Sequence, residues 1–254
     1  MAHYTELARE LVSISKRAGE SILKIYDTDF KVRGKDDSSP VTDADEQAEA
    51  VILLGLERVA PDIEVVAEEG VAAGKVPDIS SGRFFLVDPL DGTREFINRN
   101  GEFTVNIALI EQGSPVMGVV HLPALNETYW SDGERAWRQD GDGAASVISC
   151  RVAADDGLVV VASRSHRDER TDEYLASFQV KELISAGSSL KLCRLAEGGA
   201  DLYPRLGRTM EWDIAAGHAV LAAAGGSVCT LDGEPLGYGK PGLDNPDFVA
   251  RGIT

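Results

Sequence analysis

Apolar residues recur at intervals of three and four near the start of the chain, at Leu7, Leu11, Ile14, Ala18, Ile22 and Ile25. These positions fall on one face of a helix. The pattern therefore predicts an amphipathic helix over residues 4–26. A second helix is expected in the segment VTDADEQAEAVILLGLERVAP. There Thr42 is a candidate N-cap, Asp45 has the spacing of a capping box, and Pro61 lies just past the expected end.

Short apolar runs separated by polar turns follow the second helix. The segments IEVVA, GRFFLVD and EFTVNIALIEQGSPVMGVVHLP predict strands, and the last contains two strands joined by a Gly-Ser-Pro turn. ETYWSDGERAWRQDGDGAASVISC continues as a meander in which DGDG is a hairpin tip. From Gly157 onward the pattern changes to alternating short strands and helices, as in GLVVVASRSH and WDIAAGHAVLAAAGG.

This change predicts two subdomains in a protein of the α+β or α/β class. Residues 1–150 would form an N-terminal α+β unit with two helices on an antiparallel sheet that carries a candidate metal site. Residues 151–254 would form a C-terminal α/β unit. We expect one active-site crevice shared by the two units, since ligands often bind at such junctions.

Length and charge narrow the function classes. A chain of 254 residues is long enough to bury a sizeable core. The net charge of −17 argues against a nucleic-acid polymer as partner, although metal ions could still mediate contact with a small anion. No apolar run approaches the ~18 residues of a membrane span, and the start MAHYTELARE lacks a signal-peptide pattern. We therefore expect a cytoplasmic protein without integral membrane contact.

The segment FFLVDPLDGTREF places two acids directly after an apolar strand. Pro89 fixes its φ angle and Gly92 permits a left-handed backbone, so Asp88 and Asp91 are expected on one side of a rigid turn. Close carboxylates raise the pKa of one another unless a cation neutralises them. Mg²⁺ suits such a site, because it binds a few carboxylates and completes its shell with water and phosphate oxygens.

Each acid also has a simpler structural interpretation. Asp45 could only cap its helix, and Asp91 could only stabilise a turn. Glu68 and Glu69 could be solvated charges, while Asp213 could complement the dipole of the helix that it begins. These interpretations do not explain why acids at the ends of four elements flank the same turn.

The motifs VDPLDGTREF and EWDIAAGHAVLAAAGG resemble the two signatures of the inositol monophosphatase superfamily of Mg²⁺-dependent, lithium-sensitive phosphatases. SPVTDAD and VVAEEG stand at the matching upstream positions, so the four motifs span residues 39–226. EFINRNGEFTVNIALI, SRSH, GSSLKLC and LYPR are similar to the bacterial 3'(2'),5'-bisphosphate nucleotidases of the CysQ type. Arg94 departs from the more usual Lys but keeps the charge. The resemblance implies an inositol-monophosphatase-like layered αβαβα sandwich.

The resemblance also implies a set of metal ligands for two or three Mg²⁺ ions. Glu68, Asp88 and the backbone carbonyl of Leu90 would bind one ion. Asp88, Asp91 and Asp213 would bind a second. Glu68 is chosen over its neighbour because it stands 20 residues before Asp88, the usual separation in the family.

Catalytic and substrate-binding roles are implied in the same way. Asp45 would position a third ion or the attacking water, and Thr93 and Glu68 would orient that water. Gly92 and Thr93 would present N–H groups to phosphate. The substrate contacts implied further along the chain are His166, Ser188, Lys191, Arg205 and Asp213. Without the resemblance, Lys191 would be taken for an ordinary surface lysine and His166 for a loop residue.

The implied activity is removal of the 3'-phosphate of adenosine 3',5'-bisphosphate (PAP) to give AMP, in sulfate assimilation and nucleotide recycling. The corresponding phosphosulfate (PAPS) is a second candidate substrate. An inositol-1-phosphate phosphatase or a sugar bisphosphatase of the same superfamily remains an alternative. A nucleotide sensor without turnover on the same fold is another. The partner would be a small nucleotide bisphosphate, and the protein a monomer or homodimer. Family resemblance adds a peripheral location at the inner membrane.

Overall fold

Two β-sheets and the helices packed on them make up the computed structural model, which describes residues 2–30, 32–34, 40–163 and 169–253. The larger sheet has the strand order β3-β4-β5-β6-β7-β8-β9. Only β3 and β4 are parallel; the other neighbours in this sheet are antiparallel. The strands are β3 Glu64–Ala67, β4 Arg83–Asp91, β5 Thr104–Glu111, β6 Ser114–Leu122, β7 Glu127–Ser131, β8 Ala136–Asp140 and β9 Ser146–Ile148.

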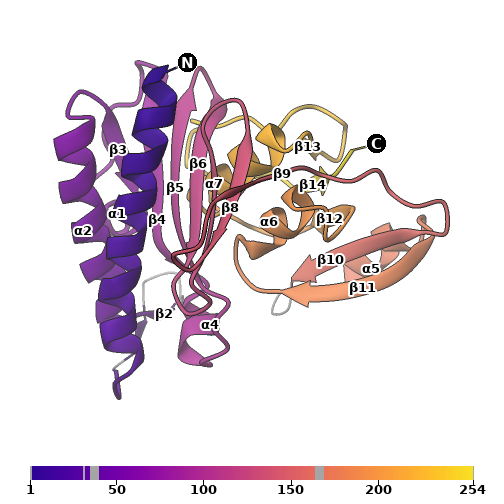
Figure 1. Ribbon diagram of the computed structural model, residues 1–254, viewed down its shortest axis with the longest axis horizontal. Helices are drawn as coiled ribbons and strands as arrows, with labels where there is room; N and C mark the ends of the chain where they lie inside the picture. The colour runs from indigo at the N-terminus through magenta and orange to yellow at the C-terminus, as the bar shows by residue number, and fades with distance from the viewer. Residues whose placement is uncertain (1, 31, 35–39, 164–168, 254) are drawn as a thin grey trace.

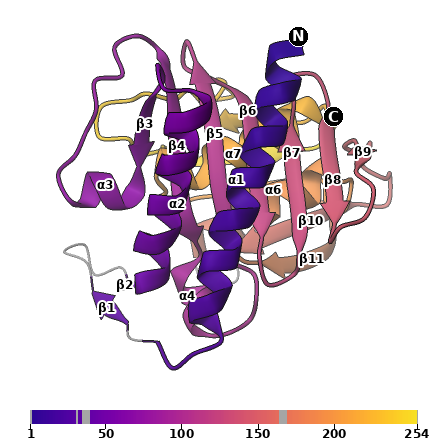
Figure 2. The same ribbon diagram turned by 60° about the vertical axis from the view of Figure 1, so that its left-hand side comes forward.

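Two long helices cover one face of this sheet (Figure 2). Helix α1 spans Ala2–Tyr26 and buries the apolar stripe that the sequence predicts. Helix α2 spans Asp43–Val59 and begins with a capping box in which Thr42 and Asp45 bond each other's backbone, as its spacing predicts. The short pair β1 Arg33–Gly34 and β2 Pro40–Val41 lies between the two helices in the chain.

The second sheet has the strand order β11-β10-β12-β14-β13. Strand β10 runs parallel to β11 and β12, while β14 is antiparallel to β12 and β13. The strands are β10 Leu158–Ser163, β11 Val180–Ala186, β12 Leu202–Arg205, β13 Ser227–Thr230 and β14 Phe248–Arg251. Helix α5, Glu169–Leu175, packs on one face through Leu175.

Helices α6, Leu190–Ala196, and α7, Glu211–Ala223, lie between the two sheets and complete an αβαβα sandwich (Figure 1). Gly118 on β6 lets α7 approach closely, because a Cβ there would lie 2.3 Å from the carbonyl oxygen of Ala216. Gly217 plays the same part between α7 and α6, where a Cβ would lie 2.6 Å from Leu192. Helix α7 thereby packs closely against both β6 and α6.

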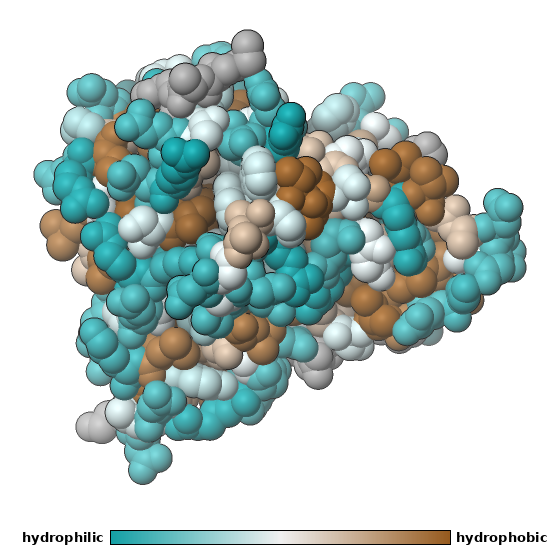
Figure 3. All heavy atoms as spheres, in the orientation of Figure 1, coloured by the Kyte–Doolittle hydropathy of each residue, from teal (hydrophilic) through white to brown (hydrophobic). Residues whose placement is uncertain are grey.

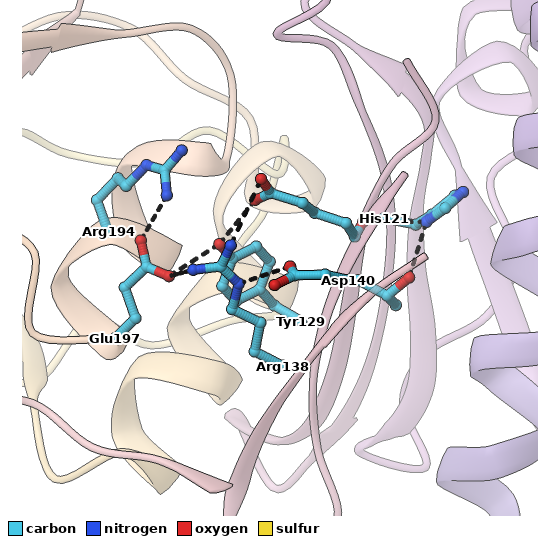
Figure 4. A network of polar contacts seen from close by, with 8 residues as sticks. His121, Tyr129, Arg138, Asp140, Arg194 and Glu197 are labelled. Atoms are coloured by element: carbon cyan, nitrogen blue, oxygen red, sulfur yellow. Dashed lines mark hydrogen bonds and ion pairs between the residues drawn. The ribbon is translucent and has the colours of Figure 1, made fainter. Parts of the chain in front are cut away.

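A network of polar contacts fixes the far end of α6 to the larger sheet (Figure 4). Arg138 on β8 forms an ion pair of 2.6 Å with Glu197, which caps the end of α6. The same carboxylate accepts a hydrogen bond of 3.0 Å from Tyr129 and pairs with Arg194 at 2.5 Å. These contacts tie the C-terminal end of α6 to β7 and β8. Its N-terminal end faces β4 and β5, where Ser189 contacts Asp91 and Asn106.

One predicted turn is wrong in detail. Strands β5 and β6 are joined at Gln112 and Gly113, whose φ angles of 49° and 77° are both positive, and Ser114 already belongs to β6. Two residues with positive φ match the twist of a hairpin, so this pair outcompetes the expected Gly-Ser-Pro turn. The division into subdomains near residue 150 stays a prediction, since α7 belongs to the second half of the chain but packs on the first sheet.

The face shown in Figure 3 carries mainly hydrophilic side chains with scattered apolar groups. Within the described parts of the chain, no helix is both long enough and apolar enough to cross a membrane.

Candidate active site

The end of β4 forms the sharp turn that the sequence predicts. A register shift separates Asp88, which pairs with Asn106 on β5, from Asp91, which pairs with Thr104. The amide of Leu90 donates a 3.0 Å hydrogen bond to Asp88 Oδ1. Gly92 then adopts a left-handed conformation with φ of 89° and precedes helix α4, Thr93–Ile97. The turn therefore holds Asp88 and Asp91 in a fixed arrangement at the C-terminal end of β4.

Asp45 caps its helix and also contacts the turn after β4. Its Oδ2 accepts 2.8 Å hydrogen bonds from both the amide and the hydroxyl of Thr42, so it does cap α2. Its Oδ1 accepts a 3.3 Å hydrogen bond from Thr93, whose hydroxyl also lies 3.4 Å from the Leu90 carbonyl. The helix cap and the turn after β4 are thus in direct contact.

Glu68 begins helix α3, Glu68–Ala72, directly after β3. Glu49, one turn beyond Asp45 on α2, accepts a 2.8 Å hydrogen bond from the amide of Glu69 and so orients the first turn of α3. Glu68 also hydrogen-bonds Asp88 and raises the pKa of that carboxyl. The interpretation of Glu68 as a purely solvated charge is therefore wrong.

Three carboxyls meet at this point, the buried Asp88 and the half-buried Asp91 and Asp213, and each has a raised pKa. Burial is the main cause for Asp88, followed by repulsion from Glu68, Asp91 and Asp213. Burial, then the charges of Asp91 and Glu68, raise the pKa of Asp213. Burial also raises the pKa of Asp91, although Lys191 and Ser189 oppose it. The protein therefore groups these acidic side chains where water solvates their charges poorly.

Such a group of carboxyls fits a hard divalent cation. All the candidate donors are oxygens, which is the ligand type that Mg²⁺ prefers. Asn106 Oδ1 and Thr104 Oγ1 are buried beside Asp88 and Asp91 without a hydrogen-bond partner in the described part of the chain. No group of three or more His, Cys, Asp or Glu among the described residues has the geometry of a metal site as it stands. The fit therefore rests on donor chemistry and on the charge that a cation would neutralise.

A pocket joins two of these acids, Asp91 and Asp213, to a group of basic residues. Seven of the predicted site residues line it, together with Ser189. The seven are Asp91, Gly92, Thr93, Ser188, Lys191, Arg205 and Asp213. Arg94 and Arg208 also line it. One cavity thus has an acidic side at the end of β4 and a basic side at α6 and β12.

Lys191 is not the surface lysine that one interpretation allowed. Its side chain is only 6% exposed, and its Nζ donates a hydrogen bond to the Ser188 carbonyl. Burial lowers the pKa of Lys191 to about 8, so the amine still carries most of its charge at pH 7. On β12, Arg205 Nε is buried without a partner among the described residues. Both cations are therefore suited to an anion that enters the pocket.

Two points separate this site from the expected one. His166 lies outside the described residues, so its predicted contact has no structural counterpart here. Ser189 was missed, although its amide and hydroxyl both donate to Asp91 Oδ2, at 2.7 and 3.0 Å. Its place between Ser188 and Lys191 in GSSLK was the available signal.

Comparisons with known proteins place the chain in a family. The model of the inositol monophosphatase family matches residues 3–250. The chain is 46% identical to the 3'(2'),5'-bisphosphate nucleotidase CysQ of Salmonella typhimurium, over 95% of this chain and 98% of that protein. The CysQ of Escherichia coli K12 is also 46% identical, over 94% of this chain and 97% of that protein.

Solved structures agree with this placement. CysQ from Bacteroides thetaiotaomicron, described as a bacterial member of the inositol monophosphatase family, is similar with a TM-score of 0.84 and 38% identity, covering 98% of both chains. An inositol monophosphatase from Thermotoga maritima shares the fold, with a TM-score of 0.75 and 23% identity over 94% of this chain and 89% of that one. Proteins of this kind are generally metal-dependent phosphatases. The chain belongs to the inositol monophosphatase family.

Proposed function

We propose that this protein is a Mg²⁺-dependent phosphomonoesterase that removes the 3'-phosphate of adenosine 3',5'-bisphosphate to give AMP. The observation that carries the proposal is the pocket in which the half-buried carboxyls of Asp91 and Asp213 face the buried cation Lys191. Arg205 also lines this pocket, and its buried Nε has no hydrogen-bond partner among the described residues. A substrate with two phosphates uses both sides of such a pocket. The similarity to CysQ nucleotidases over nearly the whole chain supports the same substrate class.

On the acidic side, Glu68, Asp88, Asp91, Asp213 and the Leu90 carbonyl would hold Mg²⁺, with two or three ions as the expected number. Bound Mg²⁺ supplies positive charge that offsets the charge of the phosphate and acidifies a water molecule. Without a metal ion, the neighbouring acids repel one another and raise the pKa of Asp88. A nearby cation would lower the free-energy cost of ionising each carboxyl, which supports a metal-binding role for them.

The attacking water would be oriented by side chains of this chain. Thr93 is suited to this task, since its hydroxyl lies between Asp45 Oδ1 and the Leu90 carbonyl and is fixed by both. Glu68, next to Asp88, would accept the second proton of the same water. Orientation of this kind is the main protein contribution in phosphoryl transfer, where positioning and charge dominate the rate.

On the basic side, Lys191, Arg205 and Ser188 would bind the second phosphate, and His166 would contribute if its predicted contact holds. Lys191 offers a desolvated ammonium, whose interaction with phosphate is stronger than at an exposed site. Arg205 offers a fork of donors suited to phosphate oxygens. Gly92 and Thr93, at the start of α4, would present N–H groups to the 3'-phosphate, which is the group that is hydrolysed.

A phosphate-release panel in the presence of Mg²⁺ tests the proposal. The substrates are adenosine 3',5'-bisphosphate and its 5'-phosphosulfate, inositol 1-phosphate and fructose 1,6-bisphosphate, each with and without Li⁺. We expect the nucleotide bisphosphate to exceed the inositol and sugar phosphates in kcat/KM by at least about tenfold, and Li⁺ to inhibit. A preference for inositol 1-phosphate or the sugar would refute the substrate assignment. Tight nucleotide binding without phosphate release would indicate a sensor.

The site of action would be the cytoplasm, and the role would be nucleotide recycling in sulfate assimilation. Assembly as a monomer or homodimer and a peripheral location at the inner membrane stay predictions.

A further inference from the structure

Ser189 stands at the junction of the acidic and basic sides of the pocket and contacts three different elements. Its amide donates a 2.7 Å hydrogen bond to Asp91 Oδ2 at the end of β4. Its hydroxyl oxygen lies 2.6 Å from the Asp213 carbonyl in the first turn of α7. The same oxygen accepts a 2.8 Å hydrogen bond from Asn106 Nδ2 on β5. Ser189 is itself only 3% exposed.

These contacts use both donors of Ser189, its amide and its hydroxyl. A serine hydroxyl has one hydrogen to donate and two lone pairs. Asn106 occupies a lone pair, and the single hydrogen is directed between the Asp213 carbonyl and Asp91 Oδ2, which lie 2.6 and 3.0 Å away. Asp91 Oδ2 thus accepts from Ser189, and this contact fixes the orientation of the carboxyl.

We propose that Ser189 is a positioning residue that sets Asp91 against the first turn of α7, where Asp213 is located, and so forms the metal site. Asn106 supports it by holding the hydroxyl oxygen from β5. Asp91 and Asp213 belong to segments 122 residues apart in the chain. Ser189 contacts both segments directly, through Asp91 Oδ2 at 2.7 Å and the Asp213 carbonyl at 2.6 Å.

The same residue links the metal site to the anion-binding turn. Ser188, Ser189 and Lys191 lie at the start of α6, and Lys191 Nζ donates to the Ser188 carbonyl within that turn. A movement of this turn therefore changes the position of Asp91 and Lys191 together. Binding at the two sides of the pocket should consequently be coupled, and such coupling is reciprocal.

Metal affinity, measured without any substrate, tests this proposal. Protein freed of metal by a chelator is titrated with Mn²⁺ in a calorimeter, for the wild type, Ser189→Ala, Ser189→Thr and Ser227→Ala. Ser227 is an exposed serine on β13 and serves as the matched control. We expect Ser189→Ala to raise the Mn²⁺ dissociation constant about tenfold. Ser189→Thr, which restores a hydroxyl, should stay within about threefold of wild type, and Ser227→Ala should match wild type.

A second readout separates positioning from simple loss of stability. In Ser189→Ala, kcat should return to within about threefold of wild type at saturating Mg²⁺, because the ligands themselves remain. A Mn²⁺ dissociation constant equal to wild type, with only the melting temperature lowered, would overturn the proposal. So would a folded Ser189→Thr that binds metal no better than Ser189→Ala.

A variant that leaves Ser189 intact keeps the proposal testable if Ser189→Ala does not fold. Asn106→Ala removes the donor to the Ser189 hydroxyl oxygen, and we expect it to weaken Mn²⁺ binding about threefold. Unchanged affinity would overturn the proposal that Asn106 supports Ser189. The proposal rests on the proposed metal site and not on the identity of the substrate. Failure of the nucleotidase assignment would therefore leave these titrations interpretable.

Discussion

Replacement of Lys191 by Met should distinguish the role of the basic side of the pocket from that of the acidic side. The substitution removes the ammonium and keeps a side chain of similar length and flexibility. We expect kcat/KM for adenosine 3',5'-bisphosphate to fall strongly. For adenosine 3'-monophosphate, which lacks the phosphate that Lys191 would bind, kcat/KM should change by less than about threefold.

The burial of Lys191 sets the expected size of this loss. The side chain is 6% exposed, and its Nζ lies 5.4 Å from the centre of the Tyr203 ring. Hydrogen bonds to charged partners contribute about 1.5–3 kcal/mol, and at a desolvated site the upper half of that range applies. The corresponding loss in kcat/KM is roughly 40- to 150-fold. Most of it should appear in KM, since the second phosphate does not react.

Phosphate release with both substrates, at saturating Mg²⁺, measures the effect. Lys181→Met removes an exposed lysine on β11 that pairs with Asp156, and it is the matched control with no expected change. Lys191→Arg keeps the charge and should retain a preference for the bisphosphate. An equal loss on both substrates in Lys191→Met would refute the assignment of Lys191 to the second phosphate, because it would show that the residue acts on the metal side.

Three further predictions concern the metal site, acid stability and packing. Asp88→Asn should lower Mg²⁺-dependent phosphate release by roughly 10³-fold or more, and near-wild-type turnover would contradict its role as a metal ligand. Burial lowers the pKa of His121 to about 4, so the folded state keeps it neutral while the unfolded state binds a proton near pH 6.5. Acid should therefore cost about 2 kcal/mol of unfolding free energy between pH 7 and pH 5 through this residue. Urea unfolding should show that loss absent in His121→Gln, and identical pH dependence would refute it. Gly118→Ala should destabilise the fold by about 2 kcal/mol or more, because its Cβ would meet the Ala216 carbonyl oxygen at 2.3 Å; an unchanged urea midpoint would show that α7 can shift freely.

Local chemistry made several features predictable from the sequence. The period of apolar residues predicts α1, since one face of that helix is buried along its length. The spacing of Thr42 and Asp45 predicts a capping box, which depends only on residues three apart. The left-handed backbone at Gly92 follows from the same kind of short-range constraint.

Features that depend on contacts between distant parts of the chain could not be predicted from the sequence. Ser189 contacts Asp91 and Asn106, which are 98 and 83 residues away, and no spacing rule joins them. Burial of Lys191 likewise depends on how α6 packs against β12, so sequence alone left a surface position open. The close approach of α7 to Gly118 is a third case, because a glycine in a strand does not reveal which helix will lie over it.

The product of one reaction tests the central proposal most directly. Purified protein is incubated with adenosine 3',5'-bisphosphate, with Mg²⁺ or with a chelator, and nucleotides and inorganic phosphate are quantified by chromatography. The proposal predicts AMP and inorganic phosphate in equal amounts with Mg²⁺, and neither with the chelator. Formation of adenosine 3'-monophosphate, or phosphate release that persists without metal, would contradict it.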